Sequence, residues 1–230
     1  GGHAGIEASL ISLKLGCKAA LVTMNKRAIG RMSCNPAIGG LSKGQIVKEM
    51  DILGGMMGVA TDFSAIQFKI LNQSKGKSVW SPRAQVDKRI YESFVLNKIV
   101  ASKLEVVEGE VVDIIHKNEN IKGVVLRDGS KIKAKSVILT CGTFLNGLIH
   151  IGQRKIRAGR MGESAADGIT ESLVKMGFKS GRLKTGTPPR INKNSIDWNN
   201  AKKVYGDEIA IPFSYRTKNF KPANHPCHSI

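Results

Sequence analysis

Gly1-Gly2-His3-Ala4-Gly5 opens the stretch that decides the fold of this 230-residue chain. Residues 2–5 match the last four positions of the pattern G-x-G-x-x-G, whose first glycine would fall one residue before Gly1. In this pattern the glycines let the backbone approach a pyrophosphate that sits at the N-terminus of the next helix. A glycine turn alone is a weak signal, so its value depends on the elements after it.

A helix and a strand are predicted directly after the turn. Apolar residues recur at helical spacing as far as Leu15, and Gly16 fits the position after a helix end, where a left-handed backbone favours glycine. Residues 19–23 form a short apolar run that is typical of a buried parallel strand. Turn, helix and strand make the second half of a dinucleotide-binding βαβ unit, so we predict an α/β, Rossmann-like fold.

One position departs from this pattern. An acidic residue usually ends the second strand and holds the ribose of the dinucleotide, but Thr23, Met24 and Asn25 stand there. Either other groups recognise the ribose, or the glycine match is a coincidence.

A second loop contains the candidate reactive group. Residues 31–44 read Arg-Met-Ser-Cys-Asn-Pro-Ala-Ile-Gly-Gly-Leu-Ser-Lys-Gly, which places a thiol, an Asn-Pro turn and two adjacent glycines before a predicted helix. A thiol near a helix N-terminus can have its pKa lowered toward the thiolate. Cys34 is therefore the candidate catalytic residue; the alternative is that it only shapes the loop.

The rest of the pattern completes one large domain and starts another. Helices are predicted over residues 46–53, 86–101 and 167–178, a polar basic loop over 69–85, and a basic loop-like segment from residue 152. Residues 104–117, 121–127 and 131–135 alternate as an antiparallel β-meander, which leads into a buried strand over 136–142 with Cys141 as a small buried residue. We predict a dinucleotide-fold domain over residues 1–190 and the start of an inserted α+β domain over 191–230. We expect both to be incomplete, in a sequence cut at both ends.

Composition limits the classes of function. The net charge of +18, from 36 basic and 18 acidic residues, suits a polyanionic partner or, equally, a solvated lysine-rich surface. Lys75, Lys77 and Arg83 in the polar loop are candidates for phosphate contact. The four cysteines include no C-x-x-C pair, which argues against zinc and a disulfide framework and favours a reducing compartment. No apolar run approaches the length that spans a bilayer.

Four segments resemble the MnmG (GidA) family of flavoproteins. They are residues 1–8; residues 32–40, Met-Ser-Cys-Asn-Pro-Ala-Ile-Gly-Gly; parts of residues 66–76, with Ile-Gln-Phe, Leu-Asn and Ser-Lys-Gly; and residues 181–190, Gly-Arg-Leu-Lys-Thr-Gly-Thr-Pro-Pro-Arg. The second and fourth strings are highly specific, and the resemblance covers essentially the whole chain. It implies FAD bound on a dinucleotide fold, NADH as reductant and a one-carbon unit from methylenetetrahydrofolate.

The resemblance also implies an activity, partners and site residues. With an MnmE-type GTPase, this family adds a carboxymethylaminomethyl or aminomethyl group to C5 of the wobble uridine (U34) of certain tRNAs. A serine that the family often places on FAD aligns with Ala166 here, and no metal site is implied. A homodimer and a cytoplasmic location, or a mitochondrial one in a eukaryote, rest on the resemblance alone. The family's site positions fall on Cys34 for the loop cysteine, on Gly1, Gly2, His3, Ala4 and Gly5 for the FAD turn, and on Val111 for a backbone contact to adenosine.

Two other classes of function stay open. One is a folate- and FAD-dependent tRNA uridine methyltransferase of the TrmFO type, which the Cys34 loop and residues 181–190 argue against. The other is a non-catalytic flavoprotein module that binds tRNA or a partner, which the intact glycines of the turn argue against.

Overall fold

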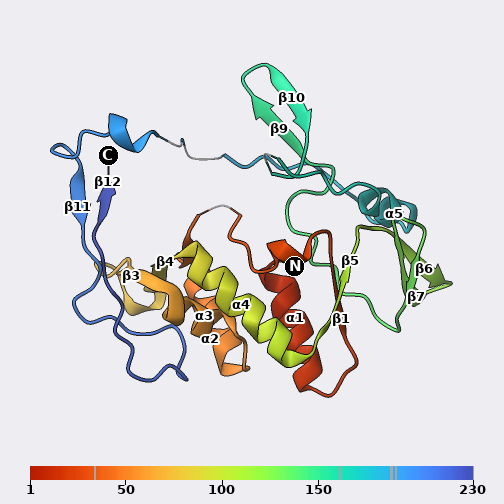
Figure 1. The fold of residues 1–230 in the computed structure, drawn as a ribbon, viewed down its shortest axis with the longest axis horizontal. Coiled ribbons are helices and arrows are strands. Elements are labelled where there is room, and N and C mark those ends of the chain that lie inside the picture. Colours follow the sequence, from red (N-terminus) through yellow and green to blue (C-terminus); the bar gives the residue numbers. More distant parts are fainter. Residues whose placement is uncertain (34, 161, 187–188, 190, 230) are drawn as a thin grey trace. The chain divides into compact units, whose positions relative to one another are not determined.

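The structure is a computed structural model that describes residues 1–33, 35–160, 162–186, 189 and 191–229. The chain divides into two compact units, and each is built from two separate segments (Figure 1). Unit 1 consists of Gly1–Ser33 and Ser102–Lys184, and unit 2 of Cys34–Ala101 and Thr185–Ile230. The domain boundary predicted at residue 190 stays a prediction.

Unit 1 begins with the turn, helix and strand that the sequence predicts. Helix α1 (His3–Lys14) starts after Gly2, and Gly16 follows it with φ of 81°, which confirms the helix and its glycine terminator. Strand β1 (Ala20–Thr23) pairs in parallel with β5 (Glu105–Glu108), which confirms the parallel strand. Ile6 of the helix and Leu21 of the strand are both buried, so α1 packs on this small sheet.

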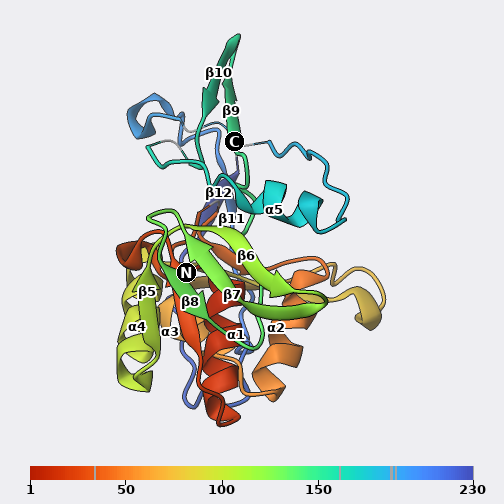
Figure 2. The same cartoon turned by 90° about the vertical axis from the view of Figure 1, so that its right-hand side faces the viewer.

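An antiparallel meander follows β5 (Figure 2). Its strands β6 (Val111–Lys117), β7 (Asn120–Leu126) and β8 (Lys131–Lys133) pair in the order β6-β7-β8, and helix α5 (Ile169–Lys175) packs on β6. The alternation over residues 104–117 had predicted one strand, but β5 and β6 belong to different sheets. Gly109 lies between them, and its N–H donates to Thr23 O (2.9 Å). A two-residue period continues through such a break, so the pattern could not reveal it.

Two further predictions for unit 1 are wrong. Residues 136–140 form no strand in the part of unit 1 that the structure describes, Ile138 is 66% exposed, and Cys141 is exposed rather than buried. An apolar run indicates that a segment can be buried, but it does not supply the neighbouring strand that a ladder needs. The basic segment after residue 152 is not a loop, because it completes a hairpin of β9 (Leu148–Ile151) and β10 (Arg154–Arg157).

Unit 2 is organised around an antiparallel sheet in the order β2-β4-β3. The polar loop predicted over residues 69–85 is partly wrong, because residues 69–71 belong to β3 and 81–85 to β4, and residues 72–80 connect the two strands. Lys69 and Arg83 face each other across the ladder, beside the fully buried pair Phe68 and Ala84. Lys69 and Arg83 are intermediate in burial and therefore lie on the less buried face of this sheet. Its elements are β2 (Ala37–Gly39), α2 (Lys43–Ile52), α3 (Met57–Ser64), β3 (Ala65–Leu71), β4 (Ser81–Val86) and α4 (Lys88–Ser102).

The helices predicted near residues 46–53 and 86–101 are confirmed as α2 and α4. The predicted apolar face of α2 is only partly correct, since Ile46 and Leu53 are exposed while Val47 and Asp51 are buried. Asp51 is buried because its carboxylate has partners farther along the chain, which helical periodicity cannot show.

The last segment, residues 191–229, is irregular, as its sequence predicts. It contains two short strands, β11 (Lys202–Val204) and β12 (Cys227–Ser229), that pair with each other. Phe213 is completely buried, with its ring edge-on to Phe68 at a centroid distance of 5.3 Å. The segment therefore contributes to the core of unit 2. Among the described residues, no helix has the length and apolar character needed to cross a membrane.

Candidate dinucleotide-binding site

The turn before α1 presents a helix N-terminus that has no side-chain cap. Gly2 is the N-cap residue, with φ of −80° and ψ of 176°, and the first turn of α1 contains no acidic residue. The first N–H groups of a helix lack carbonyl partners within the helix, and the helix dipole adds about half a positive charge there. Neither the N-cap residue nor the first turn of α1 thus supplies an anion at a place that favours one.

The three glycines of the turn have different surroundings. A Cβ atom added at Gly1 would lie 2.6 Å from Thr23 Oγ1, and one added at Gly5 would lie 2.8 Å from Thr140 Oγ1. At Gly2, by contrast, no atom lies within 4 Å of the added Cβ. Gly1 and Gly5 are therefore required by the protein's own packing, whereas Gly2 leaves space beside the helix N-terminus. A dinucleotide fits this arrangement, because its pyrophosphate needs close backbone approach at that point.

The C-terminal end of β1 meets the turn. The Gly30 N–H donates to Gly1 O (3.0 Å), and the Gly109 N–H donates to Thr23 O (2.9 Å). Val111 follows two residues after Gly109 as the first residue of β6. The structure thus brings residues 1–5 and the start of β6 to the same end of the β1–β5 sheet, which is where ligands bind in open α/β sheets.

The polar groups beyond β1 stabilise the loop that follows it. The Asn25 side chain accepts from the Arg27 N–H (2.8 Å), and Glu108 at the end of β5 accepts from the Lys26 N–H (2.8 Å). Sequence reasoning found no carboxylate at the end of β1 and missed Glu108. The neighbouring parallel strand supplies it at the matching register position, Thr23↔Glu108.

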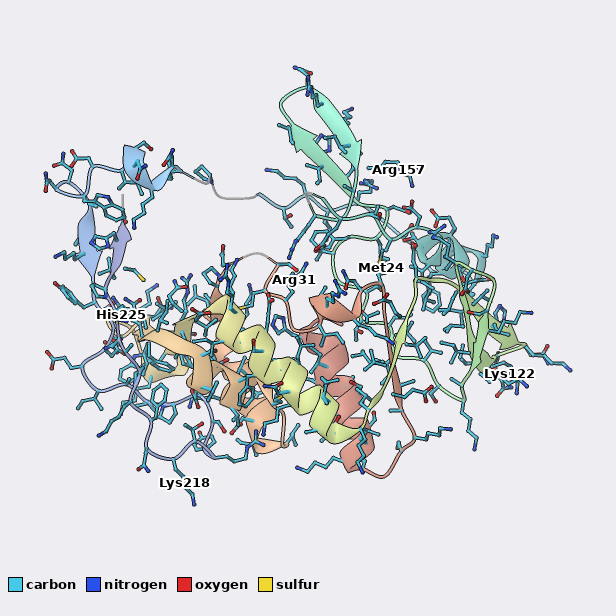
Figure 3. All side chains as sticks on the ribbon, in the orientation of Figure 1. Met24, Arg31, Lys122, Arg157, Lys218 and His225 are labelled. Atoms are coloured by element: carbon cyan, nitrogen blue, oxygen red, sulfur yellow. The ribbon has the colours of Figure 1, made fainter. Side chains whose placement is uncertain are left out.

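A second carboxylate that sequence reasoning missed joins two arginines. Glu163 Oε1 lies 3.0 Å from Arg31 Nη1 and 3.2 Å from Arg160 Nη2. It fastens the loop after β1 to the segment after the hairpin; Figure 3 labels Arg31 in that loop. Ala166, in place of the expected serine, makes only backbone hydrogen bonds among the described residues, with its O accepting from the Asn146 N–H (2.8 Å).

His3 follows the N-cap and is the only titratable side chain in the turn. Burial lowers the pKa of His3 below its ordinary value, so its ring is uncharged at neutral pH. Attraction of an anion to the turn therefore depends on backbone N–H groups and the helix dipole rather than on an imidazolium.

Cys34, the predicted catalytic residue, lies outside the described residues. Packing within unit 2 explains why glycines stand at positions 39 and 40, after Cys34 in the same loop. A Cβ on Gly39, whose φ is 85°, would collide with Pro82 O and lie 2.7 Å from Phe213 Cζ, and the Gly40 N–H donates to Pro82 O (2.9 Å). This loop therefore leads into a closely packed sheet edge. Part of the other specific string, residues 187, 188 and 190, also lies outside the described residues.

The phosphate-contact candidates in unit 2 do not form one cluster of free cations. Lys75 and Lys77 are exposed in the connection between β3 and β4, and Lys77 Nζ lies 5.9 Å from the centre of the Trp80 ring. Arg83 is half-buried within β4. Whether any of them contacts phosphate stays a prediction.

Comparison with known proteins gives consistent matches. A family model described as "Glucose inhibited division protein A" matches residues 1–230. A tRNA uridine 5-carboxymethylaminomethyl modification enzyme MnmG from Thermodesulfovibrio yellowstonii is 48% identical over 229 residues, which cover 99% of this chain and 36% of that protein. The enzyme of the same name from Flavobacterium psychrophilum is 50% identical over 230 residues, with 99% of this chain and 37% of that protein covered. The chain thus spans little more than a third of the length of these relatives.

Solved structures agree with the sequence matches. The structure of Aquifex aeolicus GidA is similar with a TM-score of 0.90 and 44% identity, over 98% of this chain and 37% of that one. A GidA-related protein from Thermus thermophilus is similar with a TM-score of 0.51 and 15% identity, over 77% of this chain and 66% of that one, which speaks for the fold alone. The predicted α/β, Rossmann-like fold is confirmed.

Proposed function

Because this chain belongs to the glucose inhibited division protein A (GidA, MnmG) family, we propose that it is part of a FAD-dependent tRNA-modifying enzyme. The enzyme adds a carboxymethylaminomethyl or aminomethyl group to C5 of the wobble uridine of certain tRNAs. The observation that carries the proposal is the uncapped helix N-terminus beside the open space at Gly2. This feature fits a dinucleotide in a chain about half identical to tRNA uridine modification enzymes.

Different residues of the chain would hold different parts of the cofactor. The backbone of Gly1, Gly2, His3, Ala4 and Gly5 would hold the FAD pyrophosphate, and the backbone of Val111 would contact the adenosine. Thr140 and Leu21 keep the turn in place through their packing on Gly5. When bound, FAD supplies two-electron redox chemistry, with NADH as the reductant.

Cys34 is the proposed nucleophile, because C5 of uracil is a poor nucleophile until C6 is attacked. The Cys34 thiolate adds to C6, so an S–C6 bond forms and the C5–C6 π electrons move into an enolate. C5 then bonds to the methylene carbon of methylenetetrahydrofolate while one of the two bonds from that carbon to a folate nitrogen breaks. The amine of glycine, or ammonium, replaces the second folate nitrogen, so tetrahydrofolate leaves. Loss of the C5 proton to a base expels the thiolate and restores the C5–C6 double bond. A thiolate suits both steps, because it is nucleophilic and also a good leaving group.

The proposed partners follow from the same family. They are the tRNA substrate, an MnmE-type GTPase and a second copy of the protein in a homodimer, all in the cytoplasm. The excess of basic residues is consistent with the tRNA partner.

Nucleoside mass spectrometry of tRNA tests the proposal. A strain that lacks the gene is complemented with the full-length wild type, with Cys34→Ser, or with Cys17→Ser as a matched control at an exposed cysteine. We expect wild type and Cys17→Ser to restore the 5-substituted wobble uridine and Cys34→Ser not to. If Cys34→Ser restores the modified uridine, the proposed function is retained but Cys34 is not the nucleophile. An unchanged wobble uridine in the deletion strain would overturn the function, and loss of a 5-methyluridine elsewhere would favour the methyltransferase.

A further inference from the structure

One stretch of unit 1 contains basic residues and no acidic ones. Residues 129–162 include seven Lys and Arg and no Asp or Glu, although the whole chain has 36 basic and 18 acidic residues. Arg157 and Arg160 form ion pairs with acidic residues that follow the stretch. An excess of one sign of charge over such a length attracts polyanions. Its most exposed part is the hairpin of β9 and β10.

The register of the hairpin defines two faces. Lys155 pairs with His150, and Ile156 pairs with Ile149. Because opposite residues in an antiparallel pair share a face, Lys155, His150 and Arg157 lie on one side of the ribbon. Arg154 lies on the other side, next to the turn and opposite Ile151. The outer end of the hairpin thus presents a cation on each face, and all four residues of β10 are exposed.

The foot of the hairpin is fixed while its outer end is not. The Ala158 N–H donates to Gly147 O (3.1 Å), and the Gly159 N–H donates to Glu163 O (3.0 Å). Arg157 Nη2, at the foot of the hairpin (Figure 3), forms an ion pair with Asp167 Oδ1 at 3.0 Å. Within the described part of the chain, Arg154 and Lys155 take part in no ion pair. A firmly held ribbon therefore presents two uncompensated cations at its end.

We propose that the outer end of the β9–β10 hairpin binds the phosphate backbone of the tRNA substrate through Arg154 and Lys155. The proposal rests on the proposed function, since it names the surface that receives the RNA. Residues 148–157 contain no Phe, Tyr or Trp, the large aromatic side chains on which bases stack. The contact is therefore to phosphate, independent of base sequence, and it positions the RNA without reading it.

An RNA backbone fits this surface better than a protein partner does. Protein interfaces are depleted in lysine and use aromatic residues and arginine as anchors. The hairpin end contains Lys155 and no Phe, Tyr or Trp, and Arg154 suits either kind of partner. Two cations without acidic neighbours match a partner that is negative along its whole length.

Salt-dependent tRNA binding by the full-length protein tests the proposal. Arg154→Gln combined with Lys155→Gln removes two charges, and Lys117→Gln combined with Lys122→Gln is the matched control. The control lysines are also exposed and lie on the meander of the same unit, near Glu119. The dissociation constant is measured for unmodified tRNA between about 50 and 200 mM KCl, where counterion release makes log K linear in log salt.

We expect the hairpin variant to reduce the slope of this line by about 2, or about 1 for each cation removed from a phosphate. The control variant should keep a slope close to that of wild type. Equal thermal unfolding temperatures and equal FAD content would show that both variants are folded. A second variant, Lys155→Glu, changes the charge by the same two units and should weaken binding to a similar extent.

An unchanged slope in the hairpin variant would overturn the proposal, as would an equal fall in both variants. A hairpin variant that binds tRNA normally but loses binding to the GTPase would reassign the surface to a protein partner. Wild-type protein that does not bind tRNA at any of these salt concentrations would instead contradict the proposed function, so the two failures can be told apart.

Discussion

At the scale of single residues, Gly2 is the position where sequence pattern and structure point to a ligand. The added Cβ meets nothing within 4 Å and Gly2 has an extended backbone, so the chain itself does not require glycine there. We expect Gly2→Ala to cost the free protein less than about 1 kcal/mol, the scale of an N-cap change. The FAD affinity should fall about tenfold or more, equivalent to about 1.4 kcal/mol, because the methyl group occupies the space beside the helix N-terminus. Titration of the apoprotein with FAD, followed by absorbance, measures this.

Gly16 at the other end of α1 gives the matched control. Its φ of 81° lies in the left-handed region, and it too has open space around it. Gly16→Ala should therefore destabilise the protein by about 1 kcal/mol and leave the FAD affinity unchanged. Equal FAD affinities for Gly2→Ala and wild type would remove the assignment of the cofactor to this turn.

Site residues that could be predicted from the sequence differ from those that could not in one respect, the number of positions that separate each residue from its partner in the chain. Gly1, Gly5 and Gly16 could be predicted, because glycines at fixed spacing report a local backbone requirement. Glu108 and Glu163 could not, because they act on residues 82 and 132 positions away. A carboxylate whose partner is set by tertiary folding leaves no local pattern.

At the scale of elements, the packing of α1 on the following segments depends on the absence of a side chain at Gly5. An added Cβ would lie 2.8 Å from Thr140 Oγ1 and 3.3 Å from Leu21 Cδ1, so Gly5→Ala forces a neighbour to move. We expect a loss of about 1–3 kcal/mol in the free energy of unfolding, as for other overpacked cores. Thr140→Ala in the same chain should recover part of this loss, because it removes the nearest atom. Additive losses in the double variant, measured by urea unfolding, would show that Thr140 does not limit the approach.

Two buried carboxylates connect helices α2 and α3 to the irregular segment near residue 213. Asp62 accepts from the Phe213 N–H (2.8 Å), the Ser214 N–H (2.9 Å) and the Thr217 hydroxyl (2.6 Å). Asp51 accepts from the Tyr215 N–H (3.0 Å) and from Arg216 Nη2 (2.6 Å). A segment without helix or strand is thus ordered by acceptors that two helices provide.

The two carboxylates should have opposite effects on acid stability. Burial raises the pKa of Asp62 more than its hydrogen bonds lower it. Burial also opposes ionisation of Asp51, but hydrogen bonds, first of all from Arg216, outweigh it and lower the pKa of Asp51. As the pH falls below the ordinary aspartate value of about 3.9, the unfolded chain takes up the Asp51 proton first, so stability is lost. Above that value the folded protein protonates Asp62 first, so acidification through this window adds stability.

Asparagine variants separate these contributions. Asp51→Asn should flatten the loss of stability on acidification, and Asp62→Asn should steepen it. At neutral pH each should also cost about 1–3 kcal/mol, because the amide places a donor where the segment needs an acceptor. Urea midpoints between about pH 3 and pH 7 measure both effects. Acid profiles that shift in the same direction for the two variants would contradict the assigned pKa directions.

Helices and strands were predictable where one buried face sets the spacing of apolar residues along the chain. Helices α1, α2 and α4 and the meander strands alternate apolar and polar residues at their own periods, so the sequence reports them. Strands β4 and β10 were predicted as loops, because β4 contains Ser81, Arg83 and Gln85 and three of the four residues of β10 are basic. Their pairing depends on partner strands, which composition does not reveal.

At the scale of the whole molecule, the order of residues along the chain differs from their grouping in space. Each compact unit takes one segment from the first half and one from the second. The fold class was predictable from the first residues, whereas this interleaving was not. A sequence pattern identifies elements in order, but Phe213 joins the core of unit 2 only through contacts with residues far back in the chain.

The charge of these 230 residues leads to a kinetic prediction. A net charge of +18 should attract tRNA over distances near the Debye length of about 10 Å at 0.1 M salt. For the full-length enzyme, kcat/KM for tRNA should therefore fall about tenfold or more between about 50 and 200 mM KCl. The kcat at saturating tRNA should change much less, because chemistry in the bound complex does not depend on long-range attraction. Steady-state assays that vary tRNA at each salt concentration separate the two. A kcat/KM that stays constant with salt would mean that the basic residues serve solubility and not the capture of RNA.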